Sequence, residues 1–217
     1  RSWKVTVGAV TAFVVIGIFD MWEDTMATLA IISVATLVCI VVGIPLGVLM
    51  SRSDRTQGII TPILDVMQTI PSFVYLIPVV MLFRVGDFSA MVAVVLYALA
   101  PAVRYAAHGI REVPAHLTEA ARMVGCTPRQ MLWRVKLPLA TPQLLLGLNQ
   151  TIMLALSMLV ITALVGTRDL GQEVYIALTK ANAGQGIVAG LSVAFIAIVA
   201  DRIVNALADK QKQRLGL

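Results

Sequence analysis

The chain has 217 residues, of which 59% are hydrophobic and only 13% are charged, and its formal net charge is +5. A soluble domain carries about a quarter charged residues, so this composition excludes an ordinary soluble globular protein. Its apolar runs are long enough to cross a hydrocarbon layer about 30 Å thick, which indicates an all-α integral membrane protein. The basic residues fall in short loops between these runs, as membrane topology requires, so the positive charge does not indicate nucleic-acid binding.

Six apolar stretches predict about six transmembrane helices within a single transmembrane domain, 1–217. They are residues 5–19, 26–50, 59–83, 91–107, 141–165 and 187–208. The first stretch is short and also fits an interfacial helix or a cleavable signal. A membrane span is preferred, because the distribution of Lys and Arg between the two sides of the membrane is then consistent with the positive-inside rule. The chain does not begin with Met, so a processed or partial product is expected.

Glycines and prolines interrupt the second and third stretches. Gly43 and Gly47 have the spacing that lets membrane helices approach closely, and the alternative is that both are merely tolerated beside Pro45. The third stretch contains three prolines that predict kinks: Pro62, Pro71 and Pro78. Between the fifth and sixth stretches, the glycine-bearing loop 166–186 is expected to hold a short helix at 171–179.

Basic residues define the orientation of the predicted spans. If the chain starts in the cytoplasm, only Arg84, Arg168 and Lys180 of its 17 Lys and Arg are external, which leaves 14 on the cytoplasmic side. The reversed orientation inverts this distribution. The positive-inside rule therefore predicts a cytoplasmic N-terminus.

Sequence motifs for catalysis, metal binding and disulfides are missing. No G-x-x-x-x-G-K-[ST] phosphate loop and no G-x-S-x-G nucleophile turn is present, so the chain is expected not to be an enzyme and not to hydrolyse ATP itself. Cys39 lies in a span and Cys126 in a basic loop, which argues against a structural disulfide. His108 and His116 have no nearby ligand set, so no metal site is expected.

The polar segment 108–138 predicts two short helices separated by a glycine turn. Gly125 follows the last apolar position of the first helix, where a left-handed cap needs glycine. Thr127 is the expected N-cap of the second helix, with Pro128 at its first position.

Each of these two helices is expected to have one apolar face, and Pro114 is expected to start the first helix. The faces consist of Leu117, Ala120, Ala121 and Val124 in the first helix and Met131, Leu132 and Val135 in the second. Pro138 is expected to end the second helix before the fifth span, because proline has no N–H to donate. The segment is therefore predicted to be a compact helix-turn-helix unit held against the membrane.

A spaced set of residues in this segment resembles the cytoplasmic-loop signature of permease subunits of binding-protein-dependent ABC importers. The set consists of Glu119, Ala120, Ala121, Gly125, Val135, Leu137 and Pro138. Val135 departs from the commoner isoleucine, a substitution of similar volume. The resemblance implies that these residues form a coupling helix that sits in a groove of an ATPase subunit. The alternative is an amphipathic loop that only covers the bilayer surface.

Three further segments resemble permeases of glycine betaine/proline betaine uptake systems: residues 51–55, 62–83 and 149–161. The resemblance extends over residues 22–202. Thr167, Arg168 and Asp169 depart from the wider importer family, in which paired glycines are common at this point.

The resemblance implies an importer of glycine betaine, proline betaine or a related quaternary amine osmolyte in the bacterial inner membrane. It also implies a second permease copy, an external binding protein, and ATPase subunits that hold ATP and Mg and switch the pore between inward-facing and outward-facing states. The alternatives are an importer permease for choline, trimethylamine N-oxide or an amino acid, an ATP-independent secondary transporter or channel, and a membrane scaffold.

Polar residues within the predicted spans are candidates for the solute pathway. An ionisable group in a span is costly to expose to lipid, so Asp65 is expected to face protein or a water-filled cavity. The alternative for these residues is interhelical hydrogen bonding that only holds the bundle together. Two aromatic residues beside the Pro71 break are the expected aromatic lining. The complete candidate set is Asp65, Gln68, Phe73, Tyr75, Asn149, Gln150 and Ser157.

Overall fold

The computed structural model describes the backbone of residues 2–215 and the side chains of residue 3 and residues 6–213. Every regular element within that range is helical, so the predicted all-α class is confirmed. The elements are α1 (Ser2–Ile18), α2 (Trp22–Arg52), α3 (Asp54–Thr69), α4 (Ser72–Phe83), α5 (Asp87–Arg111), α6 (Ala115–Met123), α7 (Pro128–Gln130), the π-helix η1 (Met131–Lys136), α8 (Leu137–Thr162), the 3-10 turn η2 (Ala163–Val165), α9 (Leu170–Thr179) and α10 (Ala183–Leu215).

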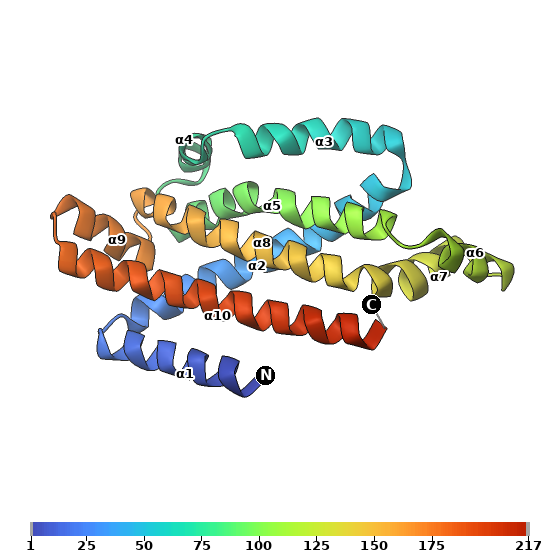
Figure 1. The fold of residues 1–217 in the computed structure, drawn as a ribbon. Coiled ribbons are helices and arrows are strands. Elements are labelled where there is room, and N and C mark those ends of the chain that lie inside the picture. The colour runs from blue at the N-terminus through green and yellow to red at the C-terminus, as the bar shows by residue number, and fades with distance from the viewer. Residues whose placement is uncertain (1, 216–217) are drawn as a thin grey trace.

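Helices α2, α5 and α8 form the centre of the bundle, and their contacts with one another bury the main apolar core. Helix α10 packs on α8, and α1 lies outside α10 (Figure 1). The two ends of the bundle differ. One carries α6 and α7, and the other carries α4 and α9 (Figure 1).

Four helical segments among the described residues are long and apolar enough to cross a membrane. They are Trp22–Arg52, Asp87–Arg111, Pro128–Val165 and Ala183–Gln213. The pair α3 and α4 counts as a fifth if it is one broken span, and its two halves meet at an angle of 96°. The apolar part of α1, Thr6–Ile18, is shorter than these segments, in agreement with the short first stretch of the sequence.

The bend between α3 and α4 falls at one of the three prolines in that stretch. Ile70 and Pro71 have extended backbone, and the structure breaks there, whereas Pro62 and Pro78 lie inside helices. The Tyr75 hydroxyl donates a hydrogen bond back across the break to the Met67 carbonyl oxygen. The predicted kink is therefore confirmed, at Pro71.

Gly43 and Gly47 bring α2 against α5. A Cβ on Gly43 would lie 2.7 Å from the Cβ of Ala102, and a Cβ on Gly47 would lie 2.5 Å from the Cβ of Ala106. Real side chains do not come that close, so both positions have room for hydrogen only. Of the two alternatives that the sequence left open, the structure supports close helix approach.

The expectation that Pro138 ends a helix is wrong. A continuous helical segment runs from Pro128 to Val165, and Pro138 lies within it. In a regular helix its ring would clash with the carbonyl group four residues earlier, but the wider turns of η1 come just before it. The polar segment is also shorter than the predicted 108–138, because His108 belongs to the last turn of α5.

Candidate functional site

The turn after α6 has the geometry that its glycine predicted. Gly125 has a φ of +82°, in the left-handed region that favours glycine. Its N–H donates to the Arg122 carbonyl oxygen at 2.9 Å, and the Cys126 N–H donates to that of Ala121 at 3.1 Å. These two bonds form a Schellman motif, which satisfies the last carbonyl groups of α6.

A reciprocal pair of hydrogen bonds starts the next helical segment. The Thr127 hydroxyl oxygen accepts from the Gln130 N–H at 3.3 Å, and the Gln130 side-chain oxygen accepts from the Thr127 N–H at 2.9 Å. Pro128 occupies the first helical position. The capping box and the Schellman motif together fix the reversal between α6 and α7.

The seven residues of the predicted coupling signature lie on two packed segments. Glu119, Ala120 and Ala121 lie on α6, and Gly125 forms the turn. Val135, Leu137 and Pro138 follow at the junction of η1 and α8. Because α6 packs against η1, the fold brings the two halves of the signature together.

Large apolar side chains project from this end of the molecule, and we call Leu117, Met123, Val124 and Trp133 the α6–α7 surface. Met123 is 89% exposed, Val124 81% and Trp133 70%. No residue of α6 is buried. The sequence prediction missed Met123 and Trp133. Their apolar side chains were visible in the sequence. Helical periodicity, however, does not tell whether another helix covers such side chains or leaves them exposed.

Exposed arginines lie on the same elements as the α6–α7 surface. Arg122 lies on α6, Arg129 on α7 and Arg134 on η1. None of these three takes part in an ion pair with another described residue. An exposed apolar patch with a charged rim is typical of a protein interaction site.

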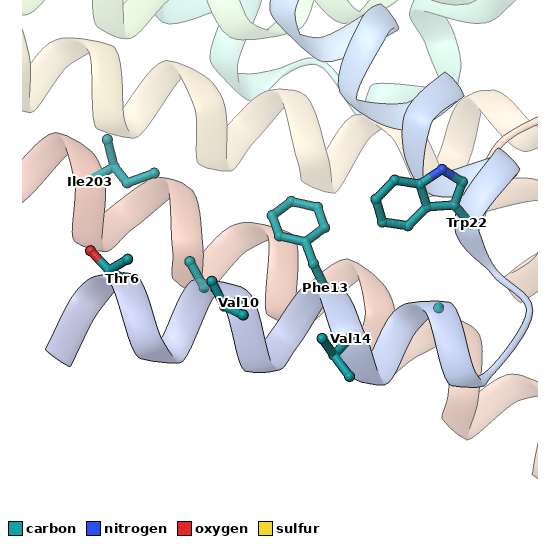
Figure 2. A pocket seen from close by; sticks show the side chains of 8 residues that line it. Thr6, Val10, Phe13, Val14, Trp22 and Ile203 are labelled. Carbon is teal, nitrogen blue, oxygen red and sulfur yellow. The ribbon is translucent and has the colours of Figure 1, made fainter. Parts of the chain in front are cut away.

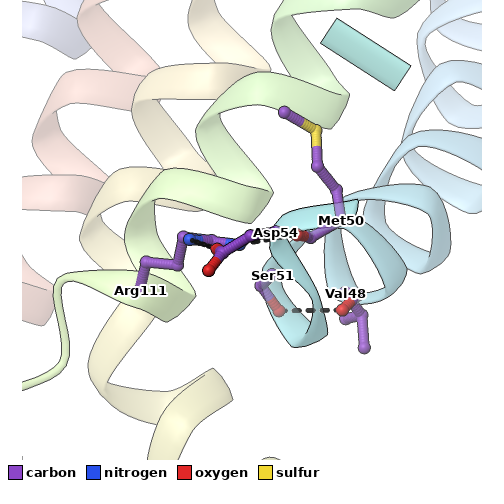
Figure 3. Close-up of polar contacts among 5 residues, drawn as sticks. All are labelled: Val48, Met50, Ser51, Asp54 and Arg111. Carbon is purple, nitrogen blue, oxygen red and sulfur yellow. Dashed lines mark hydrogen bonds and ion pairs between the residues drawn. The ribbon is translucent and has the colours of Figure 1, made fainter. Parts of the chain in front are cut away.

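Two ion pairs connect α3 to α5. The Asp65 carboxylate lies 2.5 Å from the Arg104 guanidinium, and the Asp65 side chain is 54% exposed. Nearer the α2–α3 junction, Arg111 pairs with Asp54 at 2.8 Å and donates to the Met50 carbonyl oxygen at 3.2 Å (Figure 3). The roles of Arg104 and Arg111 in these pairs were not predicted, because their partners are 39 and 57 residues away in the sequence.

A second polar cluster joins α8 to α10. Asn149 is only 8% exposed, and its amide donates to the Asp201 carboxylate at 2.7 Å. Asn205 donates to the same carboxylate oxygen at 2.8 Å. The sequence prediction included Asn149 and missed Asp201, which was visible as an acidic residue inside the last apolar stretch.

The other candidate pathway residues are spread over several elements. Tyr75 contacts Tyr97 of α5, with ring centroids 6.4 Å apart, whereas Phe73 is 56% exposed. Gln68 on α3 and Gln150 on α8 are exposed. Ser157 is exposed and donates to the Met153 carbonyl oxygen of its own helix at 3.0 Å. A single copy of the chain therefore does not bring the candidate set together in one place.

A buried carboxyl group lies at the opposite end of the bundle from the α6–α7 surface. Asp169 is fully buried and caps α9 by accepting from the Gln172 N–H at 3.0 Å. Beside it, the Leu170 N–H donates to the Thr28 hydroxyl of α2 at 3.0 Å. Burial raises the pKa of Asp169, and the Gln172 hydrogen bond opposes that shift only in part.

Comparison with known proteins identifies relatives over nearly the whole chain. Residues 39–215 match the family described as the binding-protein-dependent transport system inner membrane component. The glycine betaine/proline betaine transport system permease protein of Escherichia coli (strain K12) is 42% identical over 98% of this chain and 62% of its own length. The glycine betaine transport system permease protein of Bacillus subtilis (strain 168) is also 42% identical, over 98% of this chain and 77% of its own.

Other relatives have different named solutes. The trimethylamine N-oxide transport system permease protein of Pelagibacter ubique is 41% identical over 97% of this chain and 29% of its own length. Among solved structures, an inward-facing methionine ABC transporter is similar in fold, with a TM-score of 0.80 and 22% identity over 87% of this chain and 94% of that one. The chain thus spans less than two thirds of the Escherichia coli and Pelagibacter relatives.

Proposed function

Because this chain belongs to the family of inner membrane components of binding-protein-dependent transport systems, we propose that it is the permease subunit of an ATP-driven importer. Its solute is glycine betaine, proline betaine or a related quaternary amine osmolyte. The names of the relatives that match nearly the whole chain support this solute class. The protein itself is not an enzyme, and ATP hydrolysis, with ATP and Mg, takes place in a separate subunit.

The α6–α7 surface is the proposed docking site for the ATPase subunit. Its exposed apolar side chains are the main structural support for the proposed function. Its side chains are apolar and exposed, and the coupling signature lies on the same elements and at the start of α8. The Gly125 turn and the Thr127 capping box hold α6 at a fixed angle to the segment that continues into α8. A push on α6 would therefore reach the core of the bundle through one continuous helix.

Solute selection is proposed to lie mainly in an external binding protein. A quaternary ammonium group carries a fixed positive charge without a donor, and tight recognition of it uses an aromatic cage. This chain is only 6% aromatic. The pathway would lie between two copies of the chain, with Phe73 and Tyr75 as its aromatic contacts and the remaining polar candidates along it: Asp65, Gln68, Asn149, Gln150 and Ser157.

The setting of this permease is the bacterial inner membrane, with the N-terminus and the α6–α7 surface in the cytoplasm. The excess of Lys and Arg at the α6–α7 end supports that orientation.

A second candidate function is import of choline or trimethylamine N-oxide by the same machinery. It is favoured by the names of relatives whose identity to this chain is 29% and 41%. An amino acid is a weaker candidate, because the methionine transporter supports the fold alone. An ATP-independent secondary transporter would have no dependence on an ATPase partner.

Uptake of labelled glycine betaine tests the solute. Cells without their own uptake systems would express the full-length protein with its genomic neighbours, and proline betaine, choline and trimethylamine N-oxide would compete. We expect glycine betaine uptake, with proline betaine as a strong competitor. If another solute enters and glycine betaine does not, the solute assignment is wrong.

Co-purification tests the coupling site separately. We expect an ATPase subunit to accompany the wild-type chain and to be lost from a Met123→Glu, Val124→Glu variant. The matched control is Leu178→Glu, because Leu178 is 77% exposed on α9 at the other end of the bundle. Transport without any ATPase partner would contradict the proposal.

A further inference from the structure

The cleft between α1 and α10 has a volume of about 850 Å³ and a graded lining. On α10, the lining residues Phe195, Ile198 and Val199 are apolar. They are followed toward the C-terminal end of the helix by Arg202, Asn205, Ala206, Asp209, Lys210 and Gln213. One face of a single helix therefore changes from apolar to charged along its length.

The opposite wall of this cleft consists mostly of small residues, together with Thr11 and Val15. It includes Gly8, Ala9 and Ala12 of α1, which leave room beside α10. Helix α1 packs on the bundle mainly through α10, with Ile16 only 1% exposed. The cleft therefore lies at the edge of the bundle, between α10 and its outermost helix α1.

Arg202 and Lys210 have no ion-pair partner among the described residues. The acidic neighbour of Arg202 is engaged elsewhere, because the Asp201 carboxylate accepts from Asn149 of α8 and from Asn205. Asp209 is the single acidic residue in the lining. Two cations and one carboxylate leave the charged end of the cleft net positive.

A helix that enters the hydrocarbon layer at its first residue would bring Arg202 to the other edge of that layer. Arg202 follows Ala183, the first residue of α10, by 19 residues. At 1.5 Å per residue this is about 28 Å, close to the roughly 30 Å of a bilayer core. Lys210 lies about two turns further along the helix, where its flexible chain can reach back to the same level.

A second cleft on the other side of α1 provides a contrast. Its volume is about 540 Å³, and it is lined by Val10, Phe13, Val14, Trp22 and other residues without charge (Figure 2). Any acyl chain fits such a lining. Of these two clefts, the one with Arg202 and Lys210 has the charges to select a headgroup.

We propose that the cleft between α1 and α10 binds one anionic phospholipid, with its phosphate beside Arg202 and Lys210 and its acyl chains along Phe195, Ile198 and Val199. Charge complementarity favours this occupant, since basic pockets between membrane helices bind anionic headgroups. The site is independent of the transported solute.

Native mass spectrometry of the full-length protein in detergent tests the proposal. Delipidated protein would be titrated with phosphatidylglycerol or phosphatidylcholine, and bound lipids would be counted. We expect one phosphatidylglycerol per chain with a clear preference over phosphatidylcholine. An Arg202→Gln, Lys210→Gln variant is expected to bind phosphatidylglycerol about 25-fold more weakly, because each cation near a membrane surface contributes about a factor of five.

Two controls keep the test independent of folding. Lys212→Gln makes the same substitution as Lys210→Gln on an exposed residue of α10 outside the cleft lining, and its lipid affinity should equal that of the wild type. Asp209→Asn should bind phosphatidylglycerol more tightly. The proposal is overturned if phosphatidylcholine binds equally well, if Lys212→Gln is as damaging as the double variant, if Asp209→Asn weakens binding, or if inorganic phosphate displaces the lipid.

Discussion

At the scale of the residue, Gly125 and Asp169 determine local structure at opposite ends of the molecule. Gly125 reverses the chain with a backbone conformation that side chains disfavour. Asp169 caps α9 from a fully buried position. Both effects are local, so single substitutions can test them.

Gly125→Ala is expected to open the α6–α7 turn. An L side chain in the left-handed region costs about 1–2 kcal/mol, so amide hydrogen exchange in residues 115–130 should become faster by about five- to thirtyfold. The matched control is Gly58→Ala, because Gly58 lies in a helix with open space around it. Unchanged exchange in Gly125→Ala would show that the turn is not held by its glycine.

Asp169→Asn is expected to stabilise the protein at neutral pH. Because burial raises the folded-state pKa of Asp169 above its ordinary value of 3.8, the folded state binds the proton more tightly than the unfolded state. Stability from this group is therefore greatest at low pH and is lost as the pH rises through the folded-state pKa. Asparagine keeps the capping oxygen without the charge.

The measurement is the melting temperature in detergent as a function of pH. Asp169→Asn should melt above the wild type at neutral pH, and the difference should disappear as the pH falls toward 3.8. Asp87→Asn should give a smaller effect in the same direction, because the Asp87 charge is the weakest of the causes that raise the pKa of Asp169. A lower melting temperature for Asp169→Asn at neutral pH would contradict the prediction.

At the scale of the element, helix packing depends on small residues and on ion pairs between helices. Helices α2 and α5 meet through glycine and alanine. Helix α3 makes fewer contacts with α5 than α2 does. At the α3–α5 interface, the Asp65–Arg104 and Asp54–Arg111 pairs add to a small apolar cluster around Leu64. Exposed ion pairs contribute little to stability, so α3 is expected to move more easily than the α2–α5 pair.

Gly43→Ala is expected to destabilise the α2–α5 contact, and Ala102→Gly is expected to rescue it. The added methyl would lie 2.7 Å from the Ala102 Cβ, whereas the remaining neighbours are at 3.3 Å. Overpacking of this kind typically costs about 1–3 kcal/mol. Melting temperatures are measured for both single variants and for the double variant. The double variant should have a higher melting temperature than Gly43→Ala.

The control for this pair is Gly190→Ala, at a helical position with nothing near the added Cβ. It should be neutral or slightly stabilising, because alanine favours helix more than glycine does. If the double variant melts no higher than Gly43→Ala, the two residues are not in contact.

At the scale of the whole molecule, the basic residues gather at the end that carries α6 and α7. The opposite end contains Asp20, Glu23, Asp24 and Asp87 beside only a few cations. This asymmetry predicts which end faces the cytoplasm. The proposed lipid cleft has its charged end on the same basic side.

Thiol labelling of intact cells tests this orientation. In a Cys126→Ser background, Lys180→Cys should react with a membrane-impermeant maleimide added outside. Arg122→Cys should react only after the membrane is permeabilised. Both positions are exposed, so accessibility within the fold does not explain a difference between them. The reverse labelling pattern would invert the orientation.

The sequence by itself determined the features that depend on neighbouring residues or on overall composition. Apolar run length predicted the all-α membrane class, and the Gly125 turn, the Thr127 cap and the break at Pro71 follow from the backbone preferences of those residues. The coupling signature was also visible, because its spacing is a property of the chain. Its role stays a prediction.

Only the tertiary structure decided which distant residues meet. It paired Arg104 with Asp65 and Asp201 with Asn149, and it placed Gly43 against Ala102. It also carried the helix through Pro138, because the π turns of η1 precede that proline. Local propensity says nothing about contacts made across many residues of chain. Those contacts are fixed by the packing of helices, and packing also decides which apolar side chains, such as Met123 and Trp133, stay uncovered.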